Sequence, residues 1–184
     1  GVTAEDEGYS GVLIDTVSDS GLRALRSRLT IPVIGPGEAA FAAAMMLGKK
    51  FTVLTMWPEW FPLYQKTLTE YGFWDRVASL RSINTRPDVT ELLAGKEEVI
   101  FDKLKAEATR AMEEDGADVI VLGSTTMHQS AAFLAANLPI PVINPGQIAW
   151  KFLEGLIECG LTHSKKAFPM PEVPKDADIR KGWF

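Results

Sequence analysis

Short apolar runs alternate with amphipathic segments along this chain. The run at 119–122 is entirely apolar, which is typical of a strand buried on both faces of a parallel sheet. A strong helical periodicity over 100–115 predicts a helix with one apolar face. Further strands are predicted at 11–15, 32–34, 51–54, 77–83 and 141–143, and further helices at 21–29, 38–47, 62–71 and 147–159. This alternation predicts an α/β fold.

One pattern occurs twice, at residues 8–38 and again at 116–147. Both copies contain the sequence Ile-Pro-Val-Ile-x-Pro-Gly, and Thr16 in the first copy corresponds to Ser124 in the second. A repeat of this length is too long for a solenoid. It predicts two similar α/β lobes that face each other, each with a hydroxyl side chain at a strand end.

The predicted lobes divide the chain unevenly. The first lobe is expected to comprise residues 1–48 together with 148–184, and the second to comprise residues 49–147. The chain starts at Gly1 without methionine, and residues 1–7 read as the end of a helix. We therefore expect an N-terminal segment of the first lobe to precede this sequence.

The composition of the chain argues against several classes of protein. The 184 residues carry a net charge of −5 and no basic run, which argues against a nucleic-acid surface. No apolar run has the length of a membrane span, and no signal peptide is visible, so we expect a cytoplasmic protein without a membrane partner. A single cysteine, Cys159, excludes an internal disulfide and a cysteine-based metal cluster. It is interpreted as a core residue. No nucleotide motif is present, and we expect no cofactor.

Small hydroxyl residues follow the predicted strands. Thr16 and Thr55 each come at a strand end, and Ser124, Thr125 and Thr126 follow the strand at 119–122. Ligands of open α/β sheets bind at such ends, where the N–H groups of helix starts point outward. The neighbouring Trp57–Trp60 loop is either an apolar lid over this pocket or a packing element.

Several segments resemble the aspartate/glutamate/hydantoin racemase superfamily, most closely its hydantoin racemase branch. They are SDSGL (18–22), PVIGPGEAA (32–40), YGFWDRVASLRSI (71–83), GADVIVLGSTTM (116–127), PVINPG (141–146) and GLTHSK (160–165). The resemblance implies two pseudo-symmetric, Rossmann-like lobes with parallel sheets and a ligand cleft between them, and chemistry without a cofactor. It also implies two cysteines that face each other across the cleft, one removing the substrate α-proton and the other returning a proton on the opposite face.

Both cysteine positions of this motif hold hydroxyl residues here. The first is Thr16, and the second follows Gly123 as Ser124. An alcohol is a far weaker acid than a thiol, so the two-thiol mechanism cannot be transferred. Asp19 matches an aspartate of the family motif; it is a candidate for substrate binding, although we expect it chiefly to orient the loop. Thr55, Thr125 and Thr126 are further candidates for substrate binding. What carries over from the family is a pocket lined with small donors, which suits a small carboxylate or a cyclic imide.

His128 is a candidate base. If the helix after the strand at 119–122 starts near Thr125, His128 lies one turn beyond Ser124 on the same side. His128 could then act as the base that assists the Ser124 hydroxyl. The alternative is a helix histidine that forms an ordinary hydrogen bond.

Three function classes remain open. The first is a racemase, isomerase, decarboxylase or lyase that acts next to a carboxyl or carbonyl group, with Thr16, Ser124 and His128 as catalytic candidates. The second is a binding or regulatory protein that has lost its thiols. The third is a serine-nucleophile enzyme, which the absence of a Gly-x-Ser-x-Gly sequence disfavours. In each case we expect a homo-oligomer with a small-molecule ligand.

Overall fold

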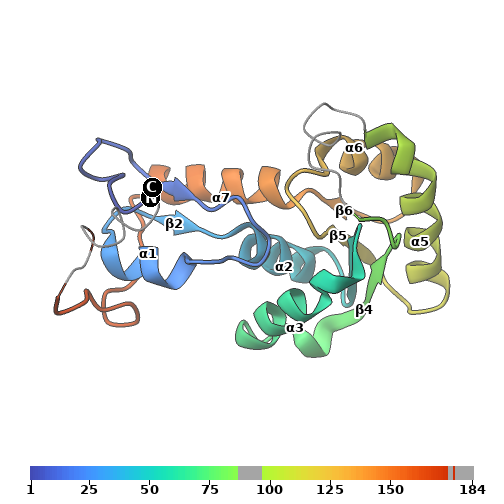
Figure 1. Cartoon of the computed structure of the whole chain (residues 1–184), viewed down its shortest axis with the longest axis horizontal. Coiled ribbons are helices and arrows are strands. Elements are labelled where there is room, and N and C mark those ends of the chain that lie inside the picture. The colour runs from blue at the N-terminus through green and yellow to red at the C-terminus, as the bar shows by residue number, and fades with distance from the viewer. Residues whose placement is uncertain (87–96, 174–175, 177–184) are drawn as a thin grey trace.

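The computed structural model describes residues 1–86, 97–173 and 176. Its larger sheet has four parallel strands in the order β4-β3-β5-β6 (Figure 1). These strands are β3 (Phe51–Thr55), β4 (Val77–Ser82), β5 (Val119–Leu122) and β6 (Val142–Ile143). A separate parallel pair consists of β1 (Val12–Leu13) and β2 (Val33–Ile34). The predicted α/β fold with parallel sheets is confirmed.

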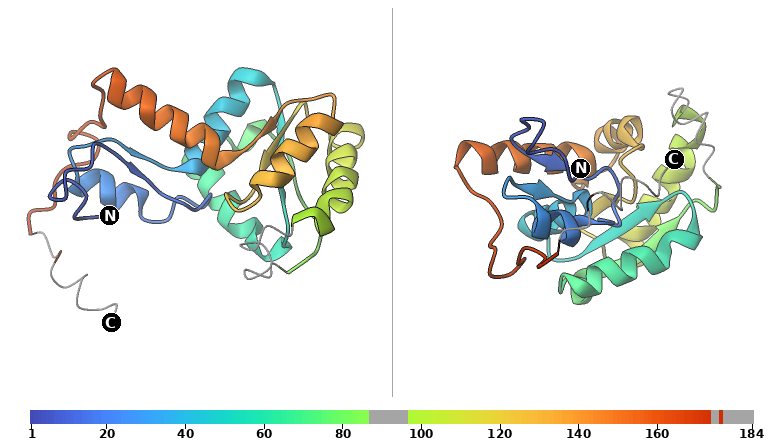
Figure 2. Two further views of the ribbon diagram at one scale, coloured as in Figure 1. Left: turned by 90° about the horizontal axis from the view of Figure 1, so that it is seen from above. Right: turned by 60° about the vertical axis from the view of Figure 1, so that its left-hand side comes forward.

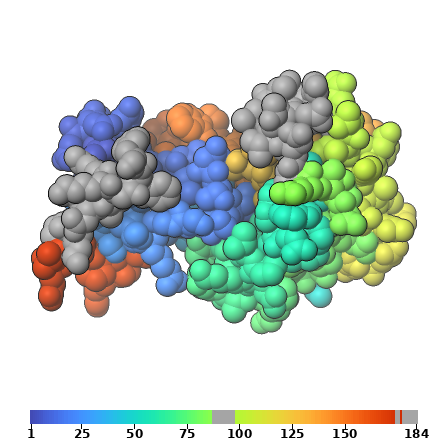
Figure 3. Space-filling model, in the orientation of Figure 1, coloured from blue at the N-terminus to red at the C-terminus, as the bar shows by residue number. Residues whose placement is uncertain are grey.

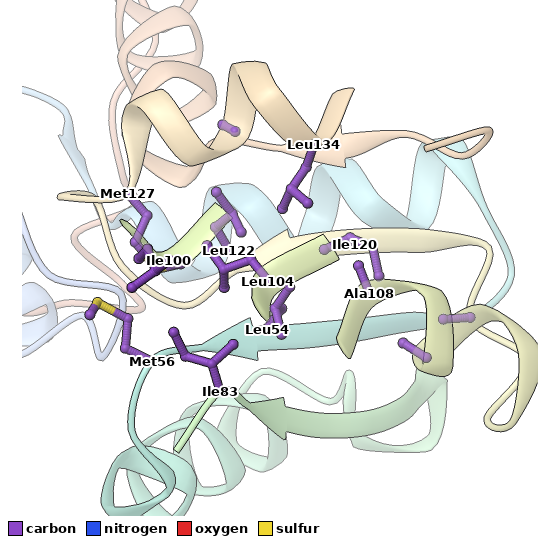
Figure 4. Close-up of a cluster of buried hydrophobic side chains, with 13 residues drawn as sticks. Leu54, Met56, Ile83, Ile100, Leu104, Ala108, Ile120, Leu122, Met127 and Leu134 are labelled. Carbon is purple, nitrogen blue, oxygen red and sulfur yellow. The ribbon is translucent and has the colours of Figure 1, made fainter. Parts of the chain in front are cut away.

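Helices cover both faces of the larger sheet. The α-helices are α1 (Leu22–Arg28), α2 (Pro36–Leu47), α3 (Phe61–Glu70), α5 (Phe101–Glu113), α6 (His128–Asn137) and α7 (Pro145–Glu158). Short 3-10 turns occupy Pro58–Trp60, Trp74–Arg76 and Glu97–Ile100. Ile120 and Leu122 of β5 pack toward α5 and α6, where Leu104 and Leu134 meet them (Figure 4). Val119 of the same strand packs toward α2 and α3. The continuous apolar run of β5 thus reflects burial on both faces.

The two sequence copies have the same strand register. Val12 pairs with Val33 in the first copy, and Ile120 pairs with Val142 at the equivalent positions of the second. The N–H of Val12 donates to Pro32 O, and the N–H of Ile120 donates to Pro141 O, at 2.9 Å in both cases. The predicted internal symmetry is therefore present in the backbone.

Helix α2 contacts both the four-stranded sheet and helix α7. Its Phe41 and Ala44 pack on the four-stranded sheet, while Ala39 packs against Ala149 and Leu153 of α7. Helix α7 in turn lies beside β1 and β2 (Figure 2). The predicted division into lobes stays a prediction, with α2 in contact with both.

The ends of the chain differ from the sequence-based expectation. Residues 1–7 form a series of turns, closed by bonds such as Ala4 N–H to Gly1 O, and are not the end of a helix. Cys159 follows the last turn of α7 and is exposed, so its interpretation as a core residue is wrong. The segment after it folds back onto α1, where Lys165 Nζ donates to the carbonyls of Arg26, Ser27 and Leu29. An ammonium group there stabilises the C-terminal end of the helix dipole.

An arginine on β4 binds the end of α5. Arg81 donates from Nε and Nη2 to the two carboxylate oxygens of Asp115, at 2.5 and 2.9 Å, and also contacts Glu107 and Glu114. These hydrogen bonds hold the pKa of Asp115 below its ordinary value. The folded chain therefore binds this proton less readily than the unfolded chain does.

Acid is expected to remove the stability that Asp115 contributes. This contribution is present above the ordinary pKa of an aspartate, about 4, and is lost as the pH falls through the lowered value. Arg81→Met should therefore lower the free energy of unfolding at pH 6 more than at pH 3, as measured by urea titration. Arg23→Met, at an exposed arginine, is the control. Equal losses at both pH values for Arg81→Met would contradict the account.

Candidate active site

Two loops from the two sequence copies form the walls of one pocket. The loop after β1 and the loop after β5 meet beside α3, and they enclose about 250 Å³. In the space-filling view the blue N-terminal part lies against the teal part that contains α3 (Figure 3). The described lining residues are Asp15, Thr16, Val17, Ser18, Trp60, Leu63, Tyr64, Gly123, Ser124, Thr125 and Thr126. The structure thus brings together four of the predicted site residues: Thr16, Ser124, Thr125 and Thr126.

Each loop presents a pair of hydroxyl groups at equivalent positions. Thr16 Oγ1 and Ser18 Oγ are 3.0 Å apart, and Ser124 Oγ and Thr126 Oγ1 are 2.9 Å apart. An equivalent backbone hydrogen bond closes each loop. The N–H of Asp19 donates to Thr16 O in the first loop, and the N–H of Met127 donates to Ser124 O in the second. A hydroxyl can donate one hydrogen bond and accept two. Each pair can therefore donate to a ligand oxygen while it stays internally bonded.

A buried tyrosine supports the second loop. Tyr64 Oη donates to Gly123 O at 2.7 Å, so the neighbouring hydroxyl of Thr55, at 3.1 Å, must donate to Tyr64. Burial raises the pKa of Tyr64 to about 12, which keeps its proton in place. Thr55 is the last residue of β3, is fully buried and is not among the lining residues. Thr55 thus supports Gly123 from below the pocket, through Tyr64. Its contact with substrate stays a prediction that this burial does not favour.

Tyr64→Phe is expected to lower the free energy of unfolding by about 1 to 2 kcal/mol, because Gly123 O then lacks a partner in a buried place. Urea unfolding measures this loss. Tyr9→Phe, at an exposed tyrosine, is the control and should change the stability by less than about 0.5 kcal/mol. Equal effects of the two variants would show that the Tyr64 hydroxyl does not stabilise the loop.

Asp19 lies behind the first loop. It is 7% exposed, and its carboxylate accepts from the N–H groups of Gly37 and Glu38 and from Tyr71 Oη. Burial raises its pKa, although these three donors oppose the shift. Asp19 is not among the described lining residues, so the structure favours the expected orienting role over contact with substrate.

The cap of α2 breaks the symmetry between the two copies. Asn144 caps α7 by accepting from Gly146 and Gln147, the positions equivalent to Gly37 and Glu38. The first copy has Gly35 in place of Asn144, and Asp19 reaches across from the loop. A Cβ at Gly35 would lie 2.4 Å from Asp19 Cγ. Glycine at this position therefore makes room for the carboxylate that joins the first loop to α2.

The helix after β5 starts later than the sequence suggested. It begins at His128 and not near Thr125, because residues 123–127 form a turn that closes through Met127 N–H and Ser124 O. The helical spacing that would pair Ser124 with His128 is therefore absent. His128 is exposed and is not among the described lining residues. Its catalytic role stays a prediction that the geometry does not support.

An aromatic wall completes the pocket. Trp60 lines it, and the ring of Trp57 meets that of Trp60 edge-on with centroids 6.2 Å apart. The guanidinium of Arg86 lies 5.7 Å from the Trp57 ring. Of the two interpretations of this loop, a place over the pocket fits Trp60, whereas Trp57 serves in packing.

The described residues hold few other functional groupings. Within residues 1–86 and 97–173, no three His, Cys, Asp or Glu side chains come together as a metal site requires. In the same ranges, no helix has the length and apolar character needed to cross a bilayer.

Known proteins are similar to this chain in both sequence and fold. The family model for the Asp/Glu/hydantoin racemases matches residues 2–153. The hydantoin racemase of Pseudomonas sp. (strain NS671) is 33% identical over 169 residues, which is 91% of this chain and 67% of that protein. The hydantoin racemase of Rhizobium meliloti is 31% identical over 88% of this chain and 66% of its own length. The chain thus spans about two thirds of the length of these relatives.

Solved structures give the same result. The allantoin racemase from Klebsiella pneumoniae superposes with a TM-score of 0.85 at 33% identity, over 94% of this chain and 70% of that one. A structure of arylmalonate decarboxylase superposes with a TM-score of 0.59 at 18% identity, over 85% of this chain and 72% of that one. At that identity the second likeness concerns the fold alone.

Proposed function

The chain belongs to the Asp/Glu/hydantoin racemase family, and from this premise we propose that it is a cofactor-independent enzyme that forms an enolate. The substrate is a small carboxylate or cyclic imide with a C–H bond next to a carbonyl group. The reaction is a racemisation, an isomerisation or a related decarboxylation or lyase step. The observation that carries the proposal is the pocket shared by two equivalent pairs of hydroxyl groups.

The hydroxyl pairs supply electrostatic stabilisation. When the C–H bond breaks, negative charge develops on the carbonyl oxygen, and fixed donors stabilise that charge. Ser124 and Thr126 already hold each other in place, and Tyr64 fixes the carbonyl that precedes them. Such a preorganised site needs little rearrangement as the enolate forms. In this proposal Thr16, Ser124, Thr125 and Thr126 contact the substrate. The cytoplasmic location and the homo-oligomeric state stay predictions.

The alternative is a homologue that binds a small metabolite without turnover. The replacement of both motif cysteines by Thr16 and Ser124 favours it, because the two-thiol proton transfer of the family motif is then absent. Such a protein would keep the pocket and its donors. Binding without chemistry separates this alternative from the proposal.

Proton exchange tests the proposed function. The unsubstituted protein is incubated in D₂O with a panel of 5-substituted hydantoins, amino acids and 2-substituted dicarboxylates, and NMR follows the α-proton. We expect exchange of at least one class above the rate in buffer, and Ser124→Ala should lower it by about 10- to 100-fold because one oxyanion donor is lost. Binding by calorimetry without exchange of any class would favour the alternative.

A further inference from the structure

We infer that Asp15 takes up and returns the substrate α-proton, so that proton transfer occurs on one face of the substrate only. This inference rests on the proposed function and concerns the same pocket. Among the reactions proposed there, it favours the isomerisation, decarboxylation and lyase steps, which need proton transfer on one face only, over racemisation. It assigns an acid–base group to a site whose hydroxyl residues cannot serve as one by themselves.

The described lining residues offer few groups that can accept a proton. Asp15 and Tyr64 are the two with titratable side chains. Tyr64 is engaged with Thr55 and Gly123, and burial raises its pKa to about 12, so it does not act as a base near neutral pH. A carboxylate is ionised at neutral pH, whereas a serine or threonine hydroxyl is not. The proton acceptor is therefore the aspartate.

The carboxylate of Asp15 is available to a ligand. Within the described part of the chain, no hydrogen bond or ion pair engages it. Two other aspartates are occupied: Asp19 accepts from three donors, and Asp118 accepts from the N–H groups of Lys49 and Lys50. Those carboxylates hold the fold together, whereas Asp15 lies exposed at the pocket with its acceptor oxygens unused.

The opposite loop has no matching group. Gly123 is equivalent to Asp15 in the second copy of the repeat, and it carries no side chain. A Cβ there would lie 2.8 Å from Thr55 Cβ and 2.8 Å from Tyr64 Oη, so the packing beneath the loop excludes a larger residue. The second loop therefore offers hydroxyl donors, and the first offers a base. This asymmetry is the reason for expecting chemistry on one face.

The step balances without a further reactant. The α-C–H bond breaks, its proton passes to an oxygen of Asp15, and the electron pair moves into the carbonyl group to form the enolate. A carboxylate serves as base for such carbon acids where donors stabilise the enolate. In the return step the carboxylic acid delivers a solvent-derived proton to the same face of the carbon. The substrate regains its starting configuration with its hydrogen exchanged.

The test uses one enantiomer of a 5-substituted hydantoin in D₂O. NMR measures exchange at C5, and chiral chromatography measures racemisation in the same samples, with buffer alone as the blank. The unsubstituted protein should exchange the proton at least about 10-fold faster than it racemises the substrate, because one face is used. Asp15→Asn should slow exchange at least about 100-fold. Asp75→Asn, at an exposed aspartate away from the pocket, should leave the exchange rate unchanged.

Chemical rescue separates catalysis from structure. Added formate should restore exchange to Asp15→Ala, because a free carboxylate can take the vacated place, and it should not accelerate the unsubstituted protein. Exchange that survives Asp15→Asn would overturn the role of Asp15 and leave the proposed function standing. Racemisation as fast as exchange would overturn the one-sided step. No exchange by the unsubstituted protein on any substrate class would overturn both this inference and the proposed function.

Discussion

A chain that carries both Thr16→Cys and Ser124→Cys is expected to racemise a 5-substituted hydantoin at least about 100-fold faster than the unsubstituted chain. These positions line the same pocket, and the resemblance to the racemase family implies a cysteine at each of them. A thiol titrates near pH 8.5 and can serve as base or acid near neutral pH, which an alcohol cannot. Two thiols would restore an acid–base group on each side of the substrate.

The single variants provide the control. Thr16→Cys alone and Ser124→Cys alone should each raise racemisation far less than the pair, because a proton must be removed from one face and delivered on the other. Chiral chromatography of an enantiopure substrate measures all three rates. A single variant as active as the pair would contradict the two-sided arrangement of the loops.

Asp19→Ala is expected to lower the free energy of unfolding by about 3 kcal/mol, because one buried and two partly buried donors lose their acceptor. For a chain of this size the loss corresponds to a fall in Tm of about 6 to 12 °C. The start of α2 loses its cap, and the first loop loses its tie to Gly37. Thermal unfolding followed by circular dichroism measures the change.

Asp118→Ala is the matched control for this prediction. Asp118 also accepts from two backbone N–H groups, those of Lys49 and Lys50, but it does so near the surface, where water can replace it. Its removal should cost about 1 kcal/mol. If the two variants melt at the same temperature, the burial of Asp19 does not increase its contribution to stability above that of Asp118.

The strands could be predicted because the apolar positions along the sequence indicate which segments are buried. The apolar run of β5 predicted a buried strand of a parallel sheet, and the repeated Ile-Pro-Val-Ile sequence predicted equivalent elements in the two copies, whose strands pair in the same register. Helix starts were predicted less well, since a cap can come from a distant residue. Nothing near Gly37 in the sequence shows that Asp19 caps α2. The turn over residues 123–127, which delays α6 to His128, likewise depends on a local backbone bond and not on periodicity.

The hydroxyl residues of the pocket could be predicted because the repeat places Thr16 and Ser124 at equivalent strand ends. Tyr64 could not, since its spacing from Leu68 is that of an ordinary buried helix face. Its function depends on Gly123 O, which only the folded chain brings within 2.7 Å. The burial of Thr55 could not be predicted for the same reason: the sequence gives its position at a strand end but not its place beneath Tyr64.

Loss of deuterium from an α-carbon tests the central claim, which is proton transfer without a thiol. An enantiopure hydantoin that carries deuterium at C5 is incubated in H₂O with the Cys159→Ser chain, which has no thiol left. The account predicts that proton signal at C5 grows as fast as with the unsubstituted protein and well above the rate in buffer. If the label stays in place while calorimetry shows that the substrate is bound, the pocket is a binding site without proton transfer.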